Sequence, residues 1–457
     1  MNLLMKIFRT IFISLFLSIV CFGDERPNII FIFADDWGWG DLGCHGHPYV
    51  KTPNIDRLAE QGTDFQRFSV ASGVCSPSRT AVMTGHFPAR YSIDGHFAWV
   101  PSNQKRNMPD WLNPQAPLLT KFLQDAGYAT AHYGKWHLSN DMIPDSPLPS
   151  AYGIDEYGAF NCAGPQMFVH DDVKMAIPFI ERSHELGKPF FINLWMHEPH
   201  TPFHVDPKLM EQFSNLPEAD AIYAATLYHA DLRIGQLLDA LEQNGLTEET
   251  LVIFSSDNGP ARGAPGTPLK LTYDTATGLG YGLGAAMGIT GGRLEHKGSL
   301  MEGGIGVPFI ARWPGKVPAG VIDNTNILSA VDLLPTFCEL AEISLPADYR
   351  PDGVSQAAVL QGEQKSKREK PLFWRMAKKS RAFAVVYQQW KMLADSELSQ
   401  FELFDLVADP LESMEVSAEK PEVVEELKTL ILEWQKTLPA TPSGPVFSAL
   451  RAENVLK

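Results

Sequence analysis

The stretch NIIFIFADD, residues 28–36, is an unbroken apolar run that ends in two aspartates. A run without polar alternation predicts a β-strand buried on both faces, as in a parallel sheet. Similar strands are predicted in ATAHYGKW, KPFFINLWMH and TLVIFSSDNG (129–136, 188–197 and 250–259), and helical patterns lie between them. This alternation predicts an α/β fold with a large, mostly parallel central sheet sandwiched by helices.

The helical patterns are clearest at 52–62 and 221–245. TPNIDRLAEQG (52–62) places Thr52 at the N-cap, Pro53 in the first position and Gly62 at the stop. Residues 221–245 form a long amphipathic pattern, and shorter ones occur at 118–128 and 171–187.

The pattern changes after residue 260. Residues 260–304 are rich in glycine and predict a loop, and QGEQKSKREK (361–370) predicts a charged linker. Strands are then predicted at 371–376, 382–393 and 401–406, with one helix at 420–438. We therefore expect a main domain over residues 24–365 and a small C-terminal unit, an antiparallel sheet with one helix, over residues 366–457.

Composition excludes some classes of protein. The 457 residues are 44% hydrophobic and 20% charged, which is globular, and the net charge is -16. An acidic surface argues against nucleic-acid binding, and any anion site must be locally basic.

Beyond the N-terminal segment, four cysteines are too widely spaced for a dense disulfide framework; they are Cys44, Cys75, Cys162 and Cys338. The sequence leaves open whether one pair is bridged.

The N-terminus has the pattern of a targeting segment. Lys6 and Arg9 precede the apolar run 10–23, which is short for a membrane span, and Cys21 and Gly23 are small residues before a cleavage point. Residues 1–23 are predicted to be a signal peptide, with a retained signal anchor as the alternative. We expect an exported protein, periplasmic or secreted, without stable membrane insertion after cleavage.

Polar residues cluster where the predicted strands end. Because ligands of open α/β sheets bind at the carboxyl ends of the strands, these segments are expected to converge. Three carboxylates and an amide suit calcium or magnesium better than zinc, although each pair alone is more often a cap or a turn. The residues are Asp35, Asp36, Lys135, His137, His197, His200, Asp257 and Asn258.

Basic residues accompany these acids. Lys135 and His137 are two positions apart, so an extended backbone would direct both to one face. His197 and His200 stand among prolines, and His296 and Lys297 lie beside a glycine. Each is more often structural when alone, but together they would hold a tetrahedral anion near a metal.

Cys75 opens the stretch CSPSRTAVMTG, residues 75–85. A buried structural thiol, a metal ligand and a thiolate nucleophile are all compatible with a lone cysteine. Zinc binding lacks partners at the usual spacing, and nearby carboxylates do not favour a thiolate.

The same stretch resembles the signature of type I sulfatases, which belong to the alkaline-phosphatase-like superfamily. Every fixed position of that signature is present: Cys75, Pro77, Ser78, Arg79, Met83, Thr84 and Gly85. ADDWGWGDLGCHG, GYATAHYGKWHL, SSDNG and HKGSLMEGGIGVPFIARWPG also match, so the resemblance covers nearly all residues from Asn28 to LFDLVADPLE. It is similar to bacterial enzymes of the arylsulfatase A and N-acetylgalactosamine-6-sulfatase type.

The resemblance implies a catalytic domain over residues 24–365 and a specific chemistry. Cys75 would be oxidised to formylglycine (3-oxoalanine) by a formylglycine-generating maturation enzyme that acts on the unfolded chain. The hydrated aldehyde would attack sulfur and later expel the sulfate. One Ca²⁺ would be bound by Asp35, Asp36, Asp257, Asn258 and residue 75.

Other roles follow from the same resemblance. Arg79 would hold the hydrated aldehyde, and Lys135 and Lys297 would neutralise the sulfate oxygens. His137 would take a proton from the second hydroxyl. His200 would protonate the leaving oxygen, with His197 as the alternative for this role and otherwise a substrate-binding residue.

The resemblance therefore implies an exported sulfuric ester hydrolase. Its expected substrates are sulfated polysaccharides or glycosaminoglycan sugars. A phosphonate or phosphate monoester hydrolase of the same superfamily is the alternative, and a non-catalytic carbohydrate-binding protein is a third. Trp374 and Trp390 would either stack on sugar rings or pack in the core.

Overall fold

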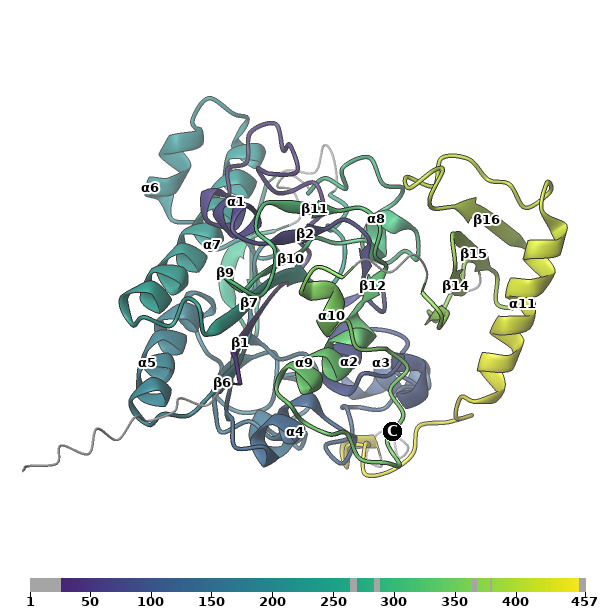
Figure 1. Cartoon of the computed structure of the whole chain (residues 1–457), viewed down its shortest axis with the longest axis horizontal. Coiled ribbons are helices and arrows are strands. Elements are labelled where there is room, and N and C mark those ends of the chain that lie inside the picture. The colour runs from purple at the N-terminus through teal and green to yellow at the C-terminus, as the bar shows by residue number, and fades with distance from the viewer. Residues whose placement is uncertain (1–25, 264–268, 283–287, 364–367, 379, 452–457) are drawn as a thin grey trace, which may run out of the picture.

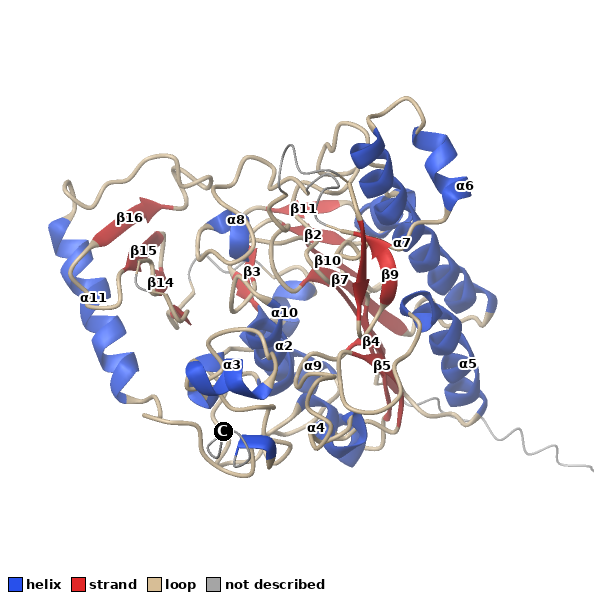
Figure 2. Cartoon of the chain, turned by 180° about the vertical axis from the view of Figure 1, so that it is seen from behind, coloured by secondary structure: helices blue, strands red, loops and turns tan. Residues whose placement is uncertain are grey.

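The structure is a computed structural model of the whole chain that describes residues 26–263, 269–282, 288–363, 368–378 and 380–451. The predicted signal peptide, residues 1–23, lies outside the described residues. A central sheet with helices on both faces forms the main body, and a small sheet with helix α11 lies at one end (Figures 1 and 2).

The main sheet has eight strands in the order β11-β2-β10-β7-β1-β6-β4-β5. All neighbours pair in parallel except β10, which is antiparallel to β2 and β7. The predicted mostly parallel sheet is therefore confirmed. Its strands are β1 (Asn28–Ala34), β2 (Thr63–Phe65), β4 (Ala129–Lys135), β5 (Glu156–Phe160), β6 (Phe190–Trp195), β7 (Thr250–Ser256), β10 (Phe309–Arg312) and β11 (Val321–Asp323).

Strand β1 shows why its sequence lacks alternation. Ile29, Phe31 and Phe33 enter the hydrophobic core on one face of the sheet, whereas Ile30 and Ile32 enter the core on the other. Each side chain fully removed from water contributes about 1.5–3 kcal/mol. Burial on both faces therefore requires the continuous apolar run that the sequence contains.

Helices cover the two faces separately (Figure 1). Helices α1 (Pro53–Glu60), α5 (Asp172–Glu185) and α7 (Glu218–Gln243) pack over one face. The opposite face carries α2 (Cys75–Thr84), α4 (Leu119–Asp125) and α9 (Leu333–Leu340). Shorter elements are α3 (Val100–Lys105), α6 (Pro207–Met210), α10 (Ala357–Leu360), β3 (Phe68–Ser69) and β12 (Leu328–Ser329).

Two segments differ from the sequence prediction. The Gly-rich stretch predicted as loop contains a hairpin of β8 (Leu271–Asp274) and β9 (Gly278–Tyr281), and the short helix α8 (Glu302–Ile305). The single strand predicted at 382–393 is two strands, because the chain turns back at Gln388, whose φ of 56° is left-handed.

The C-terminal sheet is antiparallel, as predicted, with the order β13-β14-β15-β16. Its strands are β13 (Leu372–Arg375), β14 (Phe383–Tyr387), β15 (Trp390–Ala394) and β16 (Phe401–Asp405), and α11 (Pro421–Lys436) packs against it. The indole of Trp374 is buried and donates to the carbonyl of Val70 at 2.7 Å, so this side chain packs in the core.

The structure also bears on whether the cysteines are bridged and whether a helix could cross a membrane. Cys44, Cys75, Cys162 and Cys338 are all unpaired, so no disulfide joins them. Within the described ranges, no helix is long and apolar enough to cross a membrane.

A buried ion pair joins the small sheet to the main body. Lys391 on β15 is fully buried, and its Nζ lies 2.8 Å from Oε1 of Glu302 and 2.7 Å from Oε1 of Glu412. Because neither acid is exposed to water, removal of the ammonium group would leave buried negative charge without compensation.

We expect Lys391→Met to lower the free energy of unfolding by about 3–5 kcal/mol, the usual cost of removing one partner of a buried pair. Urea denaturation followed by circular dichroism measures the change. The control is Lys174→Met, because Lys174 is exposed and pairs with Asp171 at the surface. Equal stability of the two variants would contradict the expectation.

Candidate active site

The carboxyl ends of four parallel strands meet at one edge of the sheet. Ala34 at the end of β1 is level with Ser256 of β7, and Gly134 of β4 is level with Trp195 of β6. The polar residues that follow these strands are therefore brought together, as the sequence predicted.

The acidic side chains form a compact buried set. Ligand atoms of Asp35, Asp36, Cys75 and Asp257 all lie within 4.8 Å of one another. Asn258 joins them, because its Nδ2 donates to Oδ1 of Asp36 at 2.7 Å. Its Oδ1 is buried without a hydrogen-bond partner in the part of the chain that the structure describes. An orphaned amide oxygen beside three carboxylates fits a hard cation that accepts oxygen ligands.

Three basic side chains compensate the acids. Lys135 Nζ makes an ion pair with Asp35 and lies 3.5 Å from Sγ of Cys75. Lys297 Nζ lies 2.5 Å from Oδ1 of Asp36. Burial alone would raise the pKa of Asp35, but His200, Lys135 and Arg79 together hold that pKa well below its usual range. Asp35 is therefore kept ionised in a buried position, whereas burial raises the pKa of Asp257 to about 6.

Arg79 is fully buried on α2 and connects three elements. Its Nε and NH2 groups donate to Oδ2 of Asp257 at 3.0 and 2.7 Å, and its NH1 group donates to the carbonyl of Lys135 at 2.9 Å. The guanidinium also stacks over the ring of Trp195 at 5.0 Å. In this arrangement Arg79 fixes Asp257 and the end of β4.

Cys75 is the first residue of α2 and is buried. Its thiol donates to Oδ1 of Asp35 at 3.4 Å. Burial, followed by the charge of Asp257, raises the pKa of this thiol well above its usual range. A thiol that remains protonated is not a nucleophile, so this environment disfavours the thiolate alternative.

His137 departs from its predicted conformation. Strand β4 ends at Lys135, and His137 has a left-handed backbone with a φ of 49°, so the expected extended alternation does not continue. Its Nε2 lies 3.0 Å from the carbonyl of Phe97, and its Nδ1 is buried without a hydrogen-bond partner among the described residues. This nitrogen remains free to contact a ligand.

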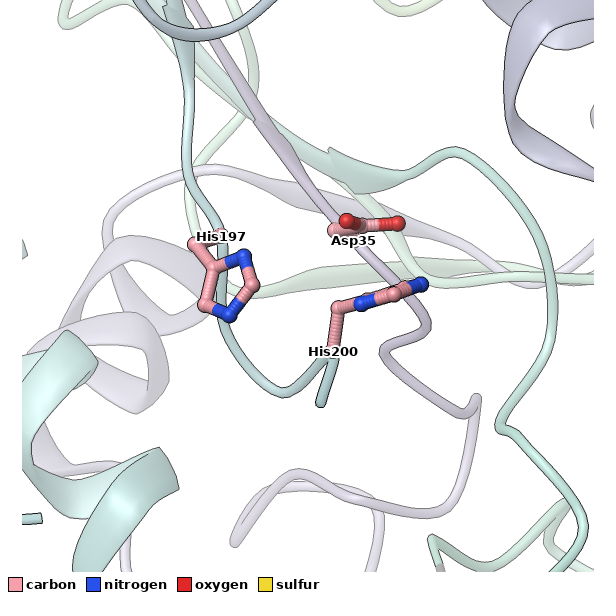
Figure 3. Close-up of side chains that lie close together, drawn as sticks. All are labelled: Asp35, His197 and His200. Atoms are coloured by element: carbon pink, nitrogen blue, oxygen red, sulfur yellow. The ribbon is translucent and has the colours of Figure 1, made fainter. Parts of the chain in front are cut away.

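His197 and His200 lie on either side of a short turn beside Asp35 (Figure 3), and ligand atoms of the three residues fall within 4.8 Å of one another. His197 is buried, whereas the side chain of His200 is 30% exposed. Burial lowers the pKa of His200 to about 3, so its ring is neutral at pH 7. Its exposed part can be reached from solvent. The nitrogen ligands of this histidine group would suit a transition metal. The unsatisfied oxygen of Asn258 belongs to the other group, with Asp35, Asp36 and Asp257, and it favours a hard cation there.

A second buried cluster, which the sequence analysis missed, anchors this turn. Glu198 accepts from NH2 of Arg233 at 2.6 Å and lies 2.9 Å from Nε2 of His170. The carbonyl of Glu198 also accepts from the backbone N–H of Asp35 at 3.3 Å. Arg233 lies 3.4 Å from Asp172, so α5 and α7 both hold the turn. The available signal was an arginine on the apolar face of the 221–245 helix.

Comparison with known proteins identifies the family. The sulfatase family profile matches residues 27–343, more than half of the chain. The chain belongs to the sulfatase family. A second profile, N-sulphoglucosamine sulphohydrolase, C-terminal, matches residues 293–437 of this sulfatase. The enzyme is therefore a sulfuric ester hydrolase, as the motifs predicted.

Its relatives support this assignment. It is 30% identical to N-acetylgalactosamine-6-sulfatase of Canis lupus familiaris over 390 residues, which cover 77% of this chain and 68% of that protein. It is 31% identical to arylsulfatase A of Homo sapiens over 391 residues, which cover 76% of this chain and 70% of that protein.

Solved structures share the whole fold. Ps i-CgsB, in complex with k-i-k-neocarrahexaose, aligns with a TM-score of 0.75 and 26% identity over 94% of this chain and 96% of that chain. A Bacteroides thetaiotaomicron protein of multiple-glycosaminoglycan metabolism, BT33336S-sulf, aligns with a TM-score of 0.73 and 25% identity over 90% of this chain and all of that chain. The alkaline-phosphatase-like fold class is confirmed.

We expect Arg233→Met to reduce kcat by roughly 100-fold with a smaller effect on KM, because misplacement of a catalytic turn by about 1 Å costs that much. Sulfate release by the purified variant measures both constants, and Arg233→Lys should recover part of kcat. The control is Arg182→Met, because Arg182 is exposed and pairs with Glu156. Loss of thermal stability with unchanged kcat would assign Arg233 a structural role only.

Proposed function

We propose that this sulfatase is exported and removes sulfate esters from sulfated polysaccharide or glycosaminoglycan sugars, with a formylglycine derived from Cys75 and one Ca²⁺. The observation that carries the proposal is the buried oxygen-rich set beside Cys75, in which the Oδ1 atom of Asn258 has no partner within the described ranges. The pattern of residues 1–23 supports export.

The calcium ligands in this proposal are Asp35, Asp36, Asp257, Asn258 and residue 75. When bound there, the ion would supply fixed positive charge against the sulfate oxygens and the nucleophile. The donor set supports this choice because all of its protein oxygens come from carboxylates and one amide.

The burial of residue 75 supports conversion to formylglycine before folding is complete. A protonated thiol offers no nucleophile, whereas a hydrated aldehyde offers a hydroxyl group. Cys75, Pro77 and Arg79 are all buried in the folded chain. A maturation enzyme that reads these residues would therefore need the unfolded chain as its partner.

The remaining roles use the chain's own groups. Lys135 and Lys297 would neutralise sulfate oxygens. Arg79 would hold Asp257 in a fixed position relative to residue 75, because it binds Asp257 from the same helix. His137 would accept a proton through its free Nδ1. His200 would protonate the leaving oxygen, because it is the more exposed of the two histidines and an incoming anion would raise its low pKa. Such acid–base help contributes roughly 10²–10⁴-fold.

The relatives support a sugar substrate. The structure of Ps i-CgsB contains a neocarrahexaose, and BT33336S-sulf belongs to glycosaminoglycan metabolism. The alternative is a phosphonate or phosphate monoester hydrolase with the same nucleophile. The phosphonate monoester hydrolase of Agrobacterium radiobacter shares the fold at a TM-score of 0.62 with 20% identity.

We expect Cys75→Ala to abolish sulfate release while the fold remains intact. Ion chromatography of released sulfate and phosphate over matched sulfated and phosphorylated oligosaccharides tests both the mechanism and the alternative. Cys162→Ala, which alters another buried and unpaired cysteine, is the control and should retain activity. Appreciable turnover by Cys75→Ala would remove the mechanism, and faster phosphate release would favour the alternative.

We expect Ca²⁺ to stabilise the protein by about 2.7 kcal/mol at 100 times its dissociation constant, because the folded state alone presents the complete site. Thermal unfolding with and without chelator measures the effect independently of activity. The stabilisation should be much reduced in Asn258→Ala, which lacks the orphaned oxygen, and retained in Asn244→Ala at the end of α7. A full calcium effect in Asn258→Ala would contradict the ligand set.

A further inference from the structure

A cavity lies between the main body and the C-terminal sheet. Its volume is about 330 Å³, which is within the range of small-molecule sites. Trp39, Gln66, Arg67 and Arg293 line it from the main body, and residues of β14 and of the segment after β16 line it from the small sheet. None of the proposed catalytic residues lines this cavity.

Arg67 gives the cavity a positive charge that is not paired with any acid in the described part of the chain. Its guanidinium makes no hydrogen bond or ion pair with any residue that the structure describes, although its side chain is only partly exposed. Burial lowers its pKa, so this charge is held at an energetic cost. An arginine presents five N–H donors in a planar fork that matches a carboxylate or a sulfate.

The charges of three acids act on Arg67: Glu302, Asp405 and Asp323. Each already has other donors, and Asp323 accepts from the backbone N–H groups of Thr325 and Asn326 at 2.8 and 2.9 Å. Glu302 is paired with Lys391 at 2.8 Å and with Arg293 at 3.4 Å. Asp405 accepts from the backbone N–H groups of Val407 and Ala408 at 3.0 and 3.1 Å. The positive charge of Arg67 is therefore available to a ligand.

Arg293 is the second arginine in the wall of the cavity. Its guanidinium stacks over the indole of Trp39 at 4.6 Å, and its NH2 group donates to the carbonyl of Gln66 at 3.1 Å. These contacts fix the orientation of the guanidinium beside Arg67. Glu302 also lines the cavity and pairs with Arg293 at 3.4 Å, so the charge that remains for a ligand is that of Arg67.

The other residues that line the cavity indicate which kind of molecule bears the anionic group. The side chains of Gln66, Ser69 and Asn324 offer amide and hydroxyl groups that can bond sugar hydroxyls. Aliphatic residues also line the cavity and suit the C–H face of a pyranose ring; these residues are Ile327, Val386, Leu406, Val407 and Leu411. The combination fits one hexose-sized residue with a negative group.

We propose that this cavity is a non-catalytic site for one anionic sugar residue, whose carboxylate or sulfate is bound by Arg67. The sugar class rests on the proposed function. Bound there, a residue of a sulfated polysaccharide would hold the polymer on the enzyme while another residue occupies the catalytic site. Small sulfate esters would gain nothing from it.

Calorimetric titration of the mature Cys75→Ala protein with D-glucuronate, glucose 6-sulfate and glucose tests the site without hydrolysis. We expect both anionic sugars to bind and glucose to bind at least 10-fold more weakly, and the tighter of the two anions identifies carboxylate or sulfate as the natural group. Arg67→Met should weaken anion binding at least 10-fold. Arg57→Met, whose arginine pairs with Asp239 at the surface, should not.

A second variant keeps Arg67 and fills the cavity: Leu411→Trp should also abolish binding. In the active enzyme, Arg67→Met should leave turnover of 4-nitrophenyl sulfate unchanged and raise KM for a sulfated polysaccharide about 10-fold. Anion binding that is unaffected by both variants would overturn the inference even if the enzyme hydrolyses sulfate esters. Arg67-dependent binding in a protein that releases no sulfate would instead overturn the proposed function alone.

Discussion

The carboxylates of Asp35, Asp36 and Asp257 are buried side by side, and the arrangement of the active-site edge depends on how their repulsion is compensated. Two like charges 4 Å apart repel by about 4 kcal/mol even at the effective dielectric constant of a protein surface. Lys135, Lys297 and Arg79 form ion pairs with these acids, and they come from the end of β4, the loop before α8 and helix α2. Charge compensation thus joins elements that are far apart in the sequence.

The same compensation explains why α2 and the end of β4 are so closely tied. Arg79 binds Asp257 and the carbonyl of Lys135 at once, so the helix that begins with Cys75 cannot move independently of the two strand ends. The turn with His197 and His200 is held in a similar way, through Glu198 and Arg233. Two buried ionic clusters therefore position the groups around residue 75, and the backbone bond from Asp35 to Glu198 connects them.

Much of this site could be predicted because its residues follow strands that are easily recognised. The apolar run of β1 specifies a buried parallel strand, and parallel strands necessarily bring Asp35, Lys135 and Asp257 to one edge. The sequence could not show where local backbone geometry interrupts a pattern. The left-handed residue Gln388 directly follows β14, and the left-handed residue His137 lies two positions beyond the end of β4, where an extended pattern would otherwise continue. The pair of Glu198 and Arg233 was also hidden, since it joins residues whose proximity depends on how α7 packs against the sheet.

The balance of charge also bears on the proposed divalent cation. Asp35, Asp36 and Asp257 carry three negative charges, and Lys135, Lys297 and Arg79 carry three positive ones, so these six groups are neutral together. A neutral buried site gives little attraction to a sulfate ester, particularly on a chain whose net charge is -16. A divalent ion on the oxygen-rich set would leave two positive charges uncompensated. That excess would match one sulfate monoanion and one ionised hydroxyl, so the charge balance of the chain supports the proposed cation.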